Sequence, residues 1–368
     1  MRVLYFTEGD SPHDRRFLSA LGDTSHHIFA LRRTSCTPKT PSGVTELRWP
    51  QGNVDWSSWY GWESGISQFK HILARVRPDI LHAGPVQGPA LLAAMAGFHP
   101  LLTMSWGSDL LLQANRSPWM RYATQFALAH TDLFLADCQT VADEAQRYGF
   151  LAENIVQFPW GVDLNHFSME NGLEDGLALR RTLGWDDQFV ILCNRTWSAL
   201  YGVDVLANAF ANAVHFNQNL RLLLVGDGPQ RDLIRQRLEP LGKTVHYPGW
   251  IDIEALPGAY CAADLFVSPS HCDGSSISLL EAMACSRPVL VSDIPSNREW
   301  VRPGVNGGLF HDGEVGSLKD KLLDMPAESG LHQFGIRSRE IAEEKANWNE
   351  NFNKLLRAYQ SAVKQVVK

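Results

Sequence analysis

Residues 265–285 read Leu-Phe-Val-Ser-Pro-Ser-His-Cys-Asp-Gly-Ser-Ser-Ile-Ser-Leu-Leu-Glu-Ala-Met-Ala-Cys. The apolar start predicts a buried strand, and the Leu/Ala/Met end predicts a helix. The polar turn between them suits a helix start, because glycine frees the backbone and serine caps the first turn. Helix N-termini bind anions, since their first N–H groups lack partners and the helix dipole is positive there. The turn Gly274, Ser275, Ser276 and Ile277 is therefore a candidate diphosphate site.

Two carboxylates flank this turn. Asp273 stands directly before it, and Glu281 lies about two turns inside the helix. Both could accept hydrogen bonds from sugar hydroxyls while the diphosphate lies on the amides. The alternative is that Asp273 is an ordinary turn residue and Glu281 an exposed helix residue, because short loop motifs match often by chance.

The wider pattern favours the ligand-binding interpretation of these two carboxylates. The carboxylates are eight positions apart and are followed by Ala-Met-Ala and a second apolar run, 289–292. This resembles the nucleotide-sugar motif of retaining glycosyltransferases of family 4, which have the GT-B fold. Asp273 replaces the first Glu of that motif, and Ser286 stands where Gly is usual. The resemblance implies that Asp273 holds the donor sugar as a catalytic residue and that Glu281 holds the ribose.

Composition bounds the alternatives. The 368 residues suffice for two domains, and 45% hydrophobic with 20% charged residues predicts folded cores. The net charge of −7 argues against non-specific nucleic-acid binding. Six scattered cysteines without a C-x-x-C pair favour a reduced, cytoplasmic chain over a zinc site (36, 138, 193, 261, 272, 285). No apolar run approaches ~18 residues, so no transmembrane helix is expected. We also expect no cofactor and no metal.

Strands and helices alternate twice along the chain, with ligand-type turns at strand ends in both halves. This order predicts an α/β protein with two parallel, doubly wound sheets. The resemblance implies a GT-B arrangement of two Rossmann-like domains facing across a cleft. We predict an acceptor-side domain over 1–167, a linker over 168–186 and a nucleotide-sugar domain over 187–345. A terminal helix over 346–368 is expected to cross back onto the first domain.

The first strand, residues 2–6, leads into a candidate ligand loop. Gly9 would let the backbone approach a ligand, and the resemblance places this loop near the donor phosphate and the acceptor. His13 and Asp14 are therefore acceptor-side candidates. Ser11 and Asp14 also form a capping box, which gives Asp14 a purely structural alternative.

Two further strand ends in this half carry polar residues. His82 resembles the first His of the family's His-Ala-His turn, with Gly84 in the second place. Trp106 stands where many members carry the His that faces the donor sugar. The remaining catalytic candidates for proton handling are therefore His82 and Asp109. Their alternatives are a hydrogen-bonded loop histidine and a plain helix cap.

The second half begins with the strand 189–193, followed by Arg195. In the family an Arg and a Lys six positions later hold the donor diphosphate. Arg195 matches the first, and its planar fork suits phosphate oxygens. Tyr201 occupies the Lys position, so one positive charge is missing. A hydrogen bond from the Tyr201 hydroxyl, or the charge of Arg231 or Lys243, could compensate for it. The resemblance also places Ile251 beside the nucleotide base.

Aromatic residues crowd the region 35–65, including Trp49, Trp56, Trp59, Tyr60 and Trp62. Such rings could stack on sugars or lie at a membrane interface, because they combine an apolar body with a polar tip. The alternative is that they cover the core of the first domain. No strongly basic amphipathic helix stands out to argue for membrane attachment.

The resulting hypothesis is a retaining, metal-independent glycosyltransferase that moves a hexose from a UDP- or GDP-sugar to a hydroxyl. The acceptor class stays open among glycans, lipid-linked glycans and small molecules, and so does peripheral association with the inner face of a membrane. Two alternatives remain: a nucleotide-sugar epimerase on a GT-B scaffold, and a non-catalytic nucleotide-sugar-binding subunit.

Overall fold

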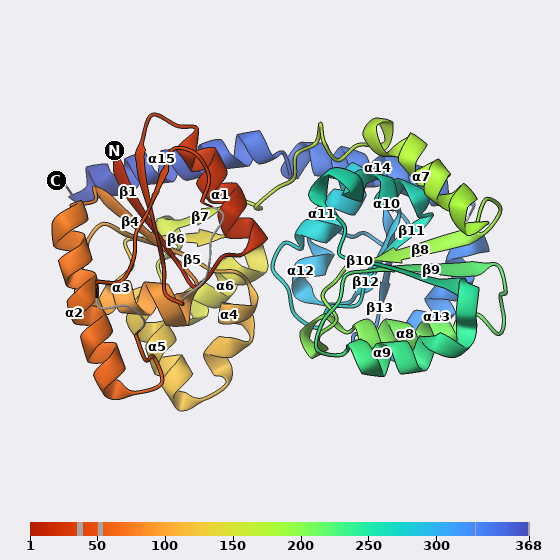
Figure 1. Ribbon diagram of the computed structural model, residues 1–368, viewed down its shortest axis with the longest axis horizontal. Helices are drawn as coiled ribbons and strands as arrows, with labels where there is room; N and C mark the ends of the chain where they lie inside the picture. Colours follow the sequence, from red (N-terminus) through yellow and green to blue (C-terminus); the bar gives the residue numbers. More distant parts are fainter. Residues whose placement is uncertain (35–39, 51–53, 328, 367–368) are drawn as a thin grey trace. The chain divides into compact units, whose positions relative to one another are not determined.

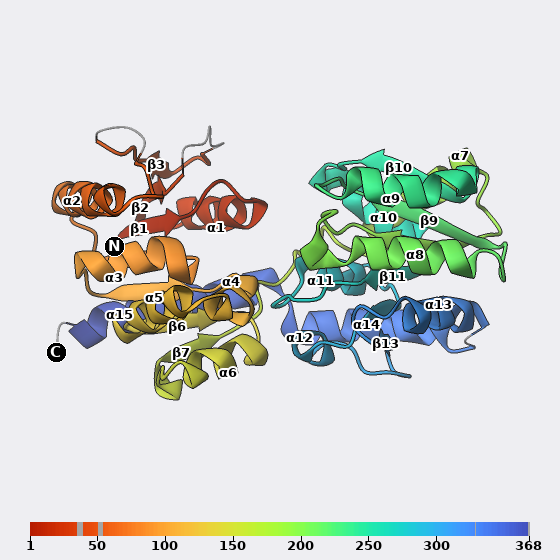
Figure 2. The same ribbon diagram turned by 90° about the horizontal axis from the view of Figure 1, so that it is seen from below.

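The computed structural model describes residues 1–34, 40–50, 54–327 and 329–366. Its contacts divide the chain into two compact units, Met1–Phe158 with Asn353–Lys368, and Pro159–Phe352. Each unit is a parallel sheet covered by helices (Figures 1 and 2). Cys36 lies outside the described residues, and the five other cysteines are free thiols. Among the described helices, none is long and apolar enough to cross a membrane.

The sheet of the first unit is entirely parallel, in the order β3-β2-β1-β4-β5-β6-β7. Its strands are β1 (Arg2–Thr7), β2 (His27–Arg32), β3 (Val44–Glu46), β4 (Ile80–Ala83), β5 (Leu101–Met104), β6 (Leu133–Ala136) and β7 (Ile155–Gln157). Its helices and short helical turns are α1 (Pro12–Gly22), α2 (Trp59–Val76), η1 (Val86–Ala90), α3 (Leu91–Ala96), α4 (Ser108–Leu111), η2 (Gln113–Asn115), α5 (Pro118–Ala129), α6 (Gln139–Arg147) and η3 (Ala152–Asn154).

The central strands of this unit are buried on both faces, as expected for a doubly wound sheet. Helices α2, α3 and α5 lie on one side of the sheet and α1 on the other (Figure 1). Trp49, Trp56 and Trp62 pack against the buried cluster around Phe69, so these three rings cover the core. Trp59 and Tyr60 differ, since their exposed fractions are 71% and 82%.

The sheet of the second unit is also entirely parallel, in the order β10-β9-β8-β11-β12-β13. Its strands are β8 (Phe189–Cys193), β9 (Leu220–Val225), β10 (Val245–Gly249), β11 (Leu265–Ser268), β12 (Val289–Ser292) and β13 (Gly307–Phe310). Its helices and turns are α7 (Met169–Leu183), η4 (Ala199–Tyr201), α8 (Val203–Ala213), α9 (Arg231–Leu238), η5 (Glu239–Thr244), η6 (Ile253–Ala255), α10 (Leu256–Ala262), α11 (Ile277–Ala284), α12 (Pro295–Arg298), α13 (Val315–Asp324), η7 (Met325–Ala327) and α14 (Leu331–Lys345).

Two buried clusters lie on the two faces of this second sheet. One joins α7, α10, α11 and α14 to the sheet, and the other joins α8, α9 and α13. Figure 1 shows these two helix layers above and below the strands. Both architectures confirm the predicted fold class of two parallel, doubly wound sheets.

The segment 168–186 differs from the predicted linker. Most of it forms α7, which packs closely on α10 of the second unit. The close approach depends on Gly172 and Gly176, where an added Cβ would lie 2.3 Å from the Pro257 carbonyl oxygen and 2.7 Å from the Ala262 nitrogen. The many polar residues of α7 face outward, which is why the segment looked like a linker in the sequence.

The chain ends in α15 (Trp348–Val366), which begins after a break that follows α14. Residues from Asn353 onward group with the first unit by their contacts. Leu355, Ala358, Tyr359 and Ala362 are buried on this helix at the regular helical spacing of three and four residues. The first unit therefore needs the end of the chain to complete its core.

Ser286 carries local backbone strain. Its φ of 56° lies in the left-handed region, which costs a residue with a side chain about 1–2 kcal/mol. Glycine adopts this conformation freely but loses about 0.4–1 kcal/mol through unfolded-state entropy. We therefore expect Ser286→Gly to raise the free energy of unfolding by about 0.5–1 kcal/mol in urea denaturation.

The matched control for this change is Gly335→Ala. There an added Cβ would lie 2.3 Å from the Ser286 carbonyl oxygen, so this variant should lose stability. A destabilised Ser286→Gly protein would show that the serine side chain stabilises the turn by more than the strain it carries.

Candidate active site

The two central strands of the second unit, β8 and β11, are neighbours in the sheet. The connections from these strands leave toward opposite sides of the sheet, and α/β proteins bind ligands at the carboxyl edge of such a pair. Arg195 follows β8, and the turn Asp273–Ser276 follows β11. Arg195 thus meets Asp273 and Ser276, which are 78 and 81 positions away in the sequence, at one edge.

Arg195 joins the two strand ends. Its Nη2 donates to Asp273 Oδ2 at 2.6 Å, and its Nη1 donates to the hydroxyls of Ser276 and Ser278 at 2.8 and 2.9 Å. The side chains of Arg195 and Asp273 are only 11% and 17% exposed. Ser276 occupies the N-cap of α11, yet no side-chain capping bond forms there. Its hydroxyl faces the guanidinium instead, which corrects the simple capping role expected from the sequence.

Tyr201 lies against the same guanidinium. The Arg195 Cζ is 4.2 Å from the centroid of the phenol ring, a cation–π geometry. The ring is positioned by a tight contact, since an added Cβ on Gly202 would lie 2.2 Å from the Pro269 carbonyl oxygen. The residue in the expected Lys position therefore supplies a flat surface beneath Arg195 rather than a second charge.

Asp273 is held in a partly desolvated environment. Burial raises the pKa of this carboxyl, and the Arg195 charge, the Ser276 hydroxyl and the Gly274 N–H partly offset that rise. Gly274 and Ser275 are buried, and Ile277 is half-buried as the first residue of α11. The turn thus combines a guanidinium, a carboxylate and a helix N-terminus in a small space, an arrangement suited to an anionic, hydroxyl-rich ligand.

Glu281 lies one turn further along α11 than Ile277, and its exposed fraction is 8%. Tyr260 Oη donates to Glu281 Oε2 at 2.7 Å, and the Asn194 side-chain amide donates to Tyr260 Oη at 2.7 Å. Tyr260 and Ser278 were not identified from the sequence, because their roles depend on which strands are neighbours. Asn194 could have been identified, since it follows β8 and directly precedes Arg195.

Ile251 follows β10 and is half-buried against the core of its unit. Its neighbour Trp250 is 70% exposed. The Cβ position at Gly226 lies 3.6 Å from the Arg195 carbonyl oxygen and 3.9 Å from the Trp250 ring. Gly226 has φ 97° and donates its N–H to Gly249, which fixes the loop beside Arg195.

In the first unit, the buried side chain of Asp109 accepts hydrogen bonds from the segments that follow β4 and β5. Its Oδ2 accepts from the Val86 N–H at 2.9 Å, and its Oδ1 accepts from the Ser105 hydroxyl and the Trp106 N–H at 2.7 and 2.9 Å. Burial raises the pKa of this carboxyl, and these hydrogen bonds partly offset the rise. The geometry favours a positioning role for Asp109, since its oxygens already serve three protein donors.

His82 lies in β4 at 1% exposure, and its Nδ1 is 2.7 Å from the Tyr359 hydroxyl. Burial lowers the pKa of this imidazole to about 3, so it is neutral at physiological pH. Its Nε2 has no hydrogen-bond partner among the described residues. This placement favours a structural contact with α15 over the proton transfer expected from the resemblance.

The three candidates near the start of α1, Gly9, His13 and Asp14, have different surroundings. His13 stacks on Trp106 with ring centroids 5.5 Å apart. Asp14 is 2% exposed and accepts from Tyr5, Thr7 and Ser11, as the capping box predicts. A Cβ on Gly9 would meet Thr34 Oγ1 at an ordinary 3.5 Å. Sterically, the Gly9 position therefore has room for a larger residue.

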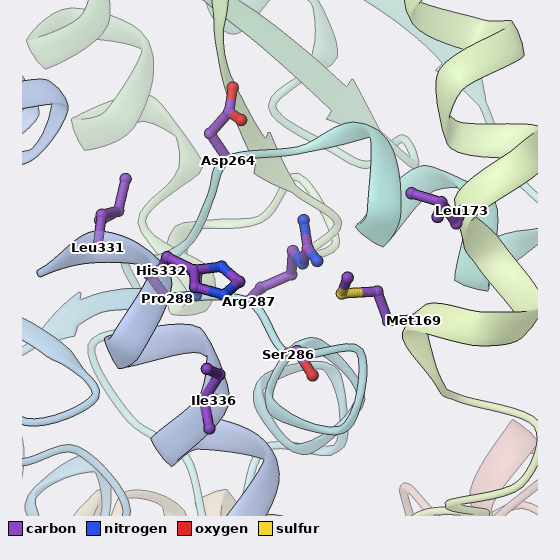
Figure 3. A pocket seen from close by; sticks show the side chains of 9 residues that line it. All are labelled: Met169, Leu173, Asp264, Ser286, Arg287, Pro288, Leu331, His332 and Ile336. Carbon is purple, nitrogen blue, oxygen red and sulfur yellow. The ribbon is translucent and has the colours of Figure 1, made fainter.

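A cavity of about 390 Å³ opens elsewhere on the second unit (Figure 3). Figure 3 shows Met169 and Leu173 of α7 on one side and Leu331 and Ile336 of α14 on the other. Asp264 and Pro288 precede β11 and β12, so this cavity lies at the amino edge of the sheet. It is therefore distinct from the Arg195 site. No group of three metal-ligating side chains gathers among the residues that the structure describes.

Comparisons with known proteins agree with this geometry. The family profile for group 1 glycosyl transferases matches residues 187–327, and that for glycosyl transferase 4-like domains matches residues 2–138. The chain is 25% identical to a D-inositol 3-phosphate glycosyltransferase of Xylanimonas cellulosilytica over 86% of its own length and 71% of the relative's. It is 26% identical to a phosphatidyl-myo-inositol mannosyltransferase of Mycobacterium leprae over 60% of its own length and 58% of the relative's.

Among solved structures, the fold is similar to that of HepE from Anabaena in complex with UDP. The TM-score is 0.80 at 20% identity, with 98% of this chain and 100% of the other covered. The two profile matches together span most of both sheets. The similarity to HepE covers nearly the whole chain and agrees with them. The chain belongs to the group 1, family-4-like glycosyltransferases.

Proposed function

We propose that this protein is a retaining glycosyltransferase that transfers a hexose from a nucleoside-diphosphate sugar to a hydroxyl of a glycan or lipid-linked acceptor. The observation that carries the proposal is the Arg195 cluster at the N-terminus of α11. A guanidinium and a helix N-terminus stabilise the negative charge that develops on a departing diphosphate. UDP-sugars are the first donors to test, because the structural neighbour HepE was solved with UDP and with UDP-glucose.

Each residue of the cluster takes a defined role in this proposal. The diphosphate takes over guanidinium hydrogen bonds that now go to Asp273 and to Ser276 and Ser278. Asp273 then accepts hydrogen bonds from hydroxyls of the donor sugar, and Glu281 from those of the ribose. The departing phosphate oxygen takes the proton of the acceptor hydroxyl on the same face of the sugar, so the anomeric configuration is retained and no divalent cation is required.

Thermal shift in the presence of EDTA tests the donor site directly. A nucleotide sugar at 100 times its Kd should stabilise the fold by about 2.7 kcal/mol through mass action. We expect a UDP- or GDP-sugar to raise Tm and ADP- and dTDP-sugars to act weakly. Arg195→Ala is the matched negative control. A full panel without any shift in the wild type would contradict the proposal.

Glu281 gives a prediction that depends on the ribose contact. Glu281→Ala should weaken UDP or GDP binding by about 1–3 kcal/mol, because a charged hydrogen-bond partner is lost. Tyr260→Phe should have a smaller effect in the same direction, since it removes the hydroxyl that donates to Glu281 Oε2 and accepts from the Asn194 amide but leaves the Glu281 carboxylate in place. Isothermal titration calorimetry measures both. Equal affinity of Glu281→Ala and wild type would remove Glu281 from the site.

A further inference from the structure

The cavity at the amino edge of the second sheet is bordered by exposed apolar side chains (Figure 3). Met169 and Leu173 of α7 and Ile336 of α14 are 38%, 42% and 37% exposed. Met169 and Leu173 are four positions apart, so they lie on one face of their helix. Single exposed apolar residues are common on protein surfaces, but a group of them around one cavity is typical of a ligand-binding site.

Arg287 lines the same cavity, and its backbone is fixed by the end of α11. Ser286 has a left-handed φ of 56° and donates its N–H to the Met283 carbonyl at 3.0 Å. The Arg287 N–H donates to the Ala282 carbonyl at 2.9 Å. These two bonds form a Schellman motif, which closes the helix and sets the direction of the following residue.

The Arg287 side chain is also held in place, and its charge has no counterpart in the fold. Its Nε donates to the Cys285 carbonyl and its Nη1 to the Ala263 carbonyl, both at 2.9 Å. Both acceptors are neutral, and Arg287 forms no ion pair with any residue that the structure describes. Asp264 also lines the cavity, but its Oδ2 pairs with Arg180 Nη1 at 3.0 Å. Figure 3 shows the Arg287 side chain in the space between α7 and α14.

A partly buried cation between apolar walls is stabilised by an anion that forms hydrogen bonds with it. The volume of about 390 Å³ lies in the range of small-molecule sites. A carboxylate suits a single guanidinium better than a phosphate monoester, because it buries one negative charge rather than about two.

We propose that this cavity binds a small molecule that carries a carboxylate on an apolar body. The carboxylate pairs with the Arg287 guanidinium, and the apolar body lies against Met169, Leu173 and Ile336. This ligand site is separate from the Arg195 site and does not depend on the proposed glycosyl transfer.

NMR titration with 4-phenylbutyrate tests the site, because this probe joins a carboxylate to a ring that can contact the Met169 sulfur. In protein with ¹³C-methyl methionine, the Met169 resonance is assigned by its loss in Met169→Leu. We expect it to shift with a Kd of about 1 mM or lower, the range for a ligand of this size. The resonance of Met95, on α3 of the first unit, should stay unchanged.

The neutral analogue 4-phenylbutanol measures the contribution of the charge. It should bind at least about tenfold more weakly, because its hydroxyl lacks the charge that pairs with Arg287. Arg287→Gln should weaken 4-phenylbutyrate binding by a similar factor.

Leu173→Trp tests the cavity without changing its charge. The indole should fill the space and weaken 4-phenylbutyrate binding at least about tenfold, and the half-exposed position of Leu173 should allow the variant to fold. Leu177→Trp is the matched control, because Leu177 is 45% exposed on the same helix but does not line the cavity. It should bind like the wild type.

A Met169 resonance that does not respond to 4-phenylbutyrate would overturn the proposal. So would equal binding of 4-phenylbutanol, or binding to Leu173→Trp as tight as to Leu177→Trp. A Met169 resonance that shifts with protein concentration alone would also reject it, because the apolar rim would then be a contact between copies of this chain.

Discussion

Arg195→Ala is expected to lower kcat/KM for sugar transfer by about 10²–10³. Arg195 is a cation at the carboxyl edge of the second sheet, beside the N-terminus of α11, and loss of one preorganised donor to a developing anion has this order of effect. Arg195→Lys should fall between the wild type and Arg195→Ala. Lysine keeps the charge but cannot make the forked contacts that Arg195 makes now to Asp273, Ser276 and Ser278. Steady-state kinetics with the donor identified by thermal shift measures the effect.

The control for this prediction is Arg231→Ala. Arg231 is about half-exposed and pairs with Asp227 at 2.6 Å, so its loss should leave kcat/KM nearly unchanged. Arg195→Ala also leaves Asp273 buried without its partner, which destabilises the fold. The double variant Arg195→Ala/Asp273→Ala should therefore recover stability without recovering activity. Transfer by Arg195→Ala within threefold of the wild type would exclude Arg195 from charge stabilisation.

The second large effect is a loss of stability in acid caused by His82. Its pKa is about 3 when folded and about 6.5 when unfolded, so the unfolded chain binds one more proton between these values. The stability that His82 contributes is complete above pH 6.5 and falls as the pH drops toward 3. Between pH 7 and 4.5 we expect a loss of about 2–3 kcal/mol from this residue.

Urea denaturation at both pH values measures this loss, with circular dichroism to follow unfolding. His82→Asn should remove this part of the pH dependence while it keeps a polar group facing the Tyr359 hydroxyl. His71→Asn replaces an exposed histidine on α2 and should keep the wild-type pH dependence. Identical pH dependence in wild type and His82→Asn would show that His82 is solvated in the folded state.

The sequence alone determined the parts of this protein that depend on residues close together in the chain. The strand–turn–helix at 265–285 was readable because apolar periodicity and a Gly/Ser turn are local properties. The fold class followed from the repeated alternation of strands and helices. Asp273, Ser276 and Arg195 were identified because each stands at the end of a strand, where α/β folds place ligands.

Only the tertiary structure decided which of these residues act together. Arg195 meets Ser278, and Tyr260 meets Glu281, because β8 and β11 are neighbours in the sheet, and no local signal encodes that adjacency. A serine of the turn, Ser276, occupies the N-cap as expected but makes no side-chain capping bond, since its hydroxyl faces Arg195 instead. Likewise, α7 looked like a linker because its glycines reveal their packing only against α10.

Burial separated the remaining candidates for the same reason. His82 and Asp109 resemble site residues in the sequence, yet the fold covers one with Tyr359 and surrounds the other with N–H and hydroxyl donors. The spacing of residues along the chain determined the strands and helices. Packing between distant segments decided which side chains lie together and can bind a ligand.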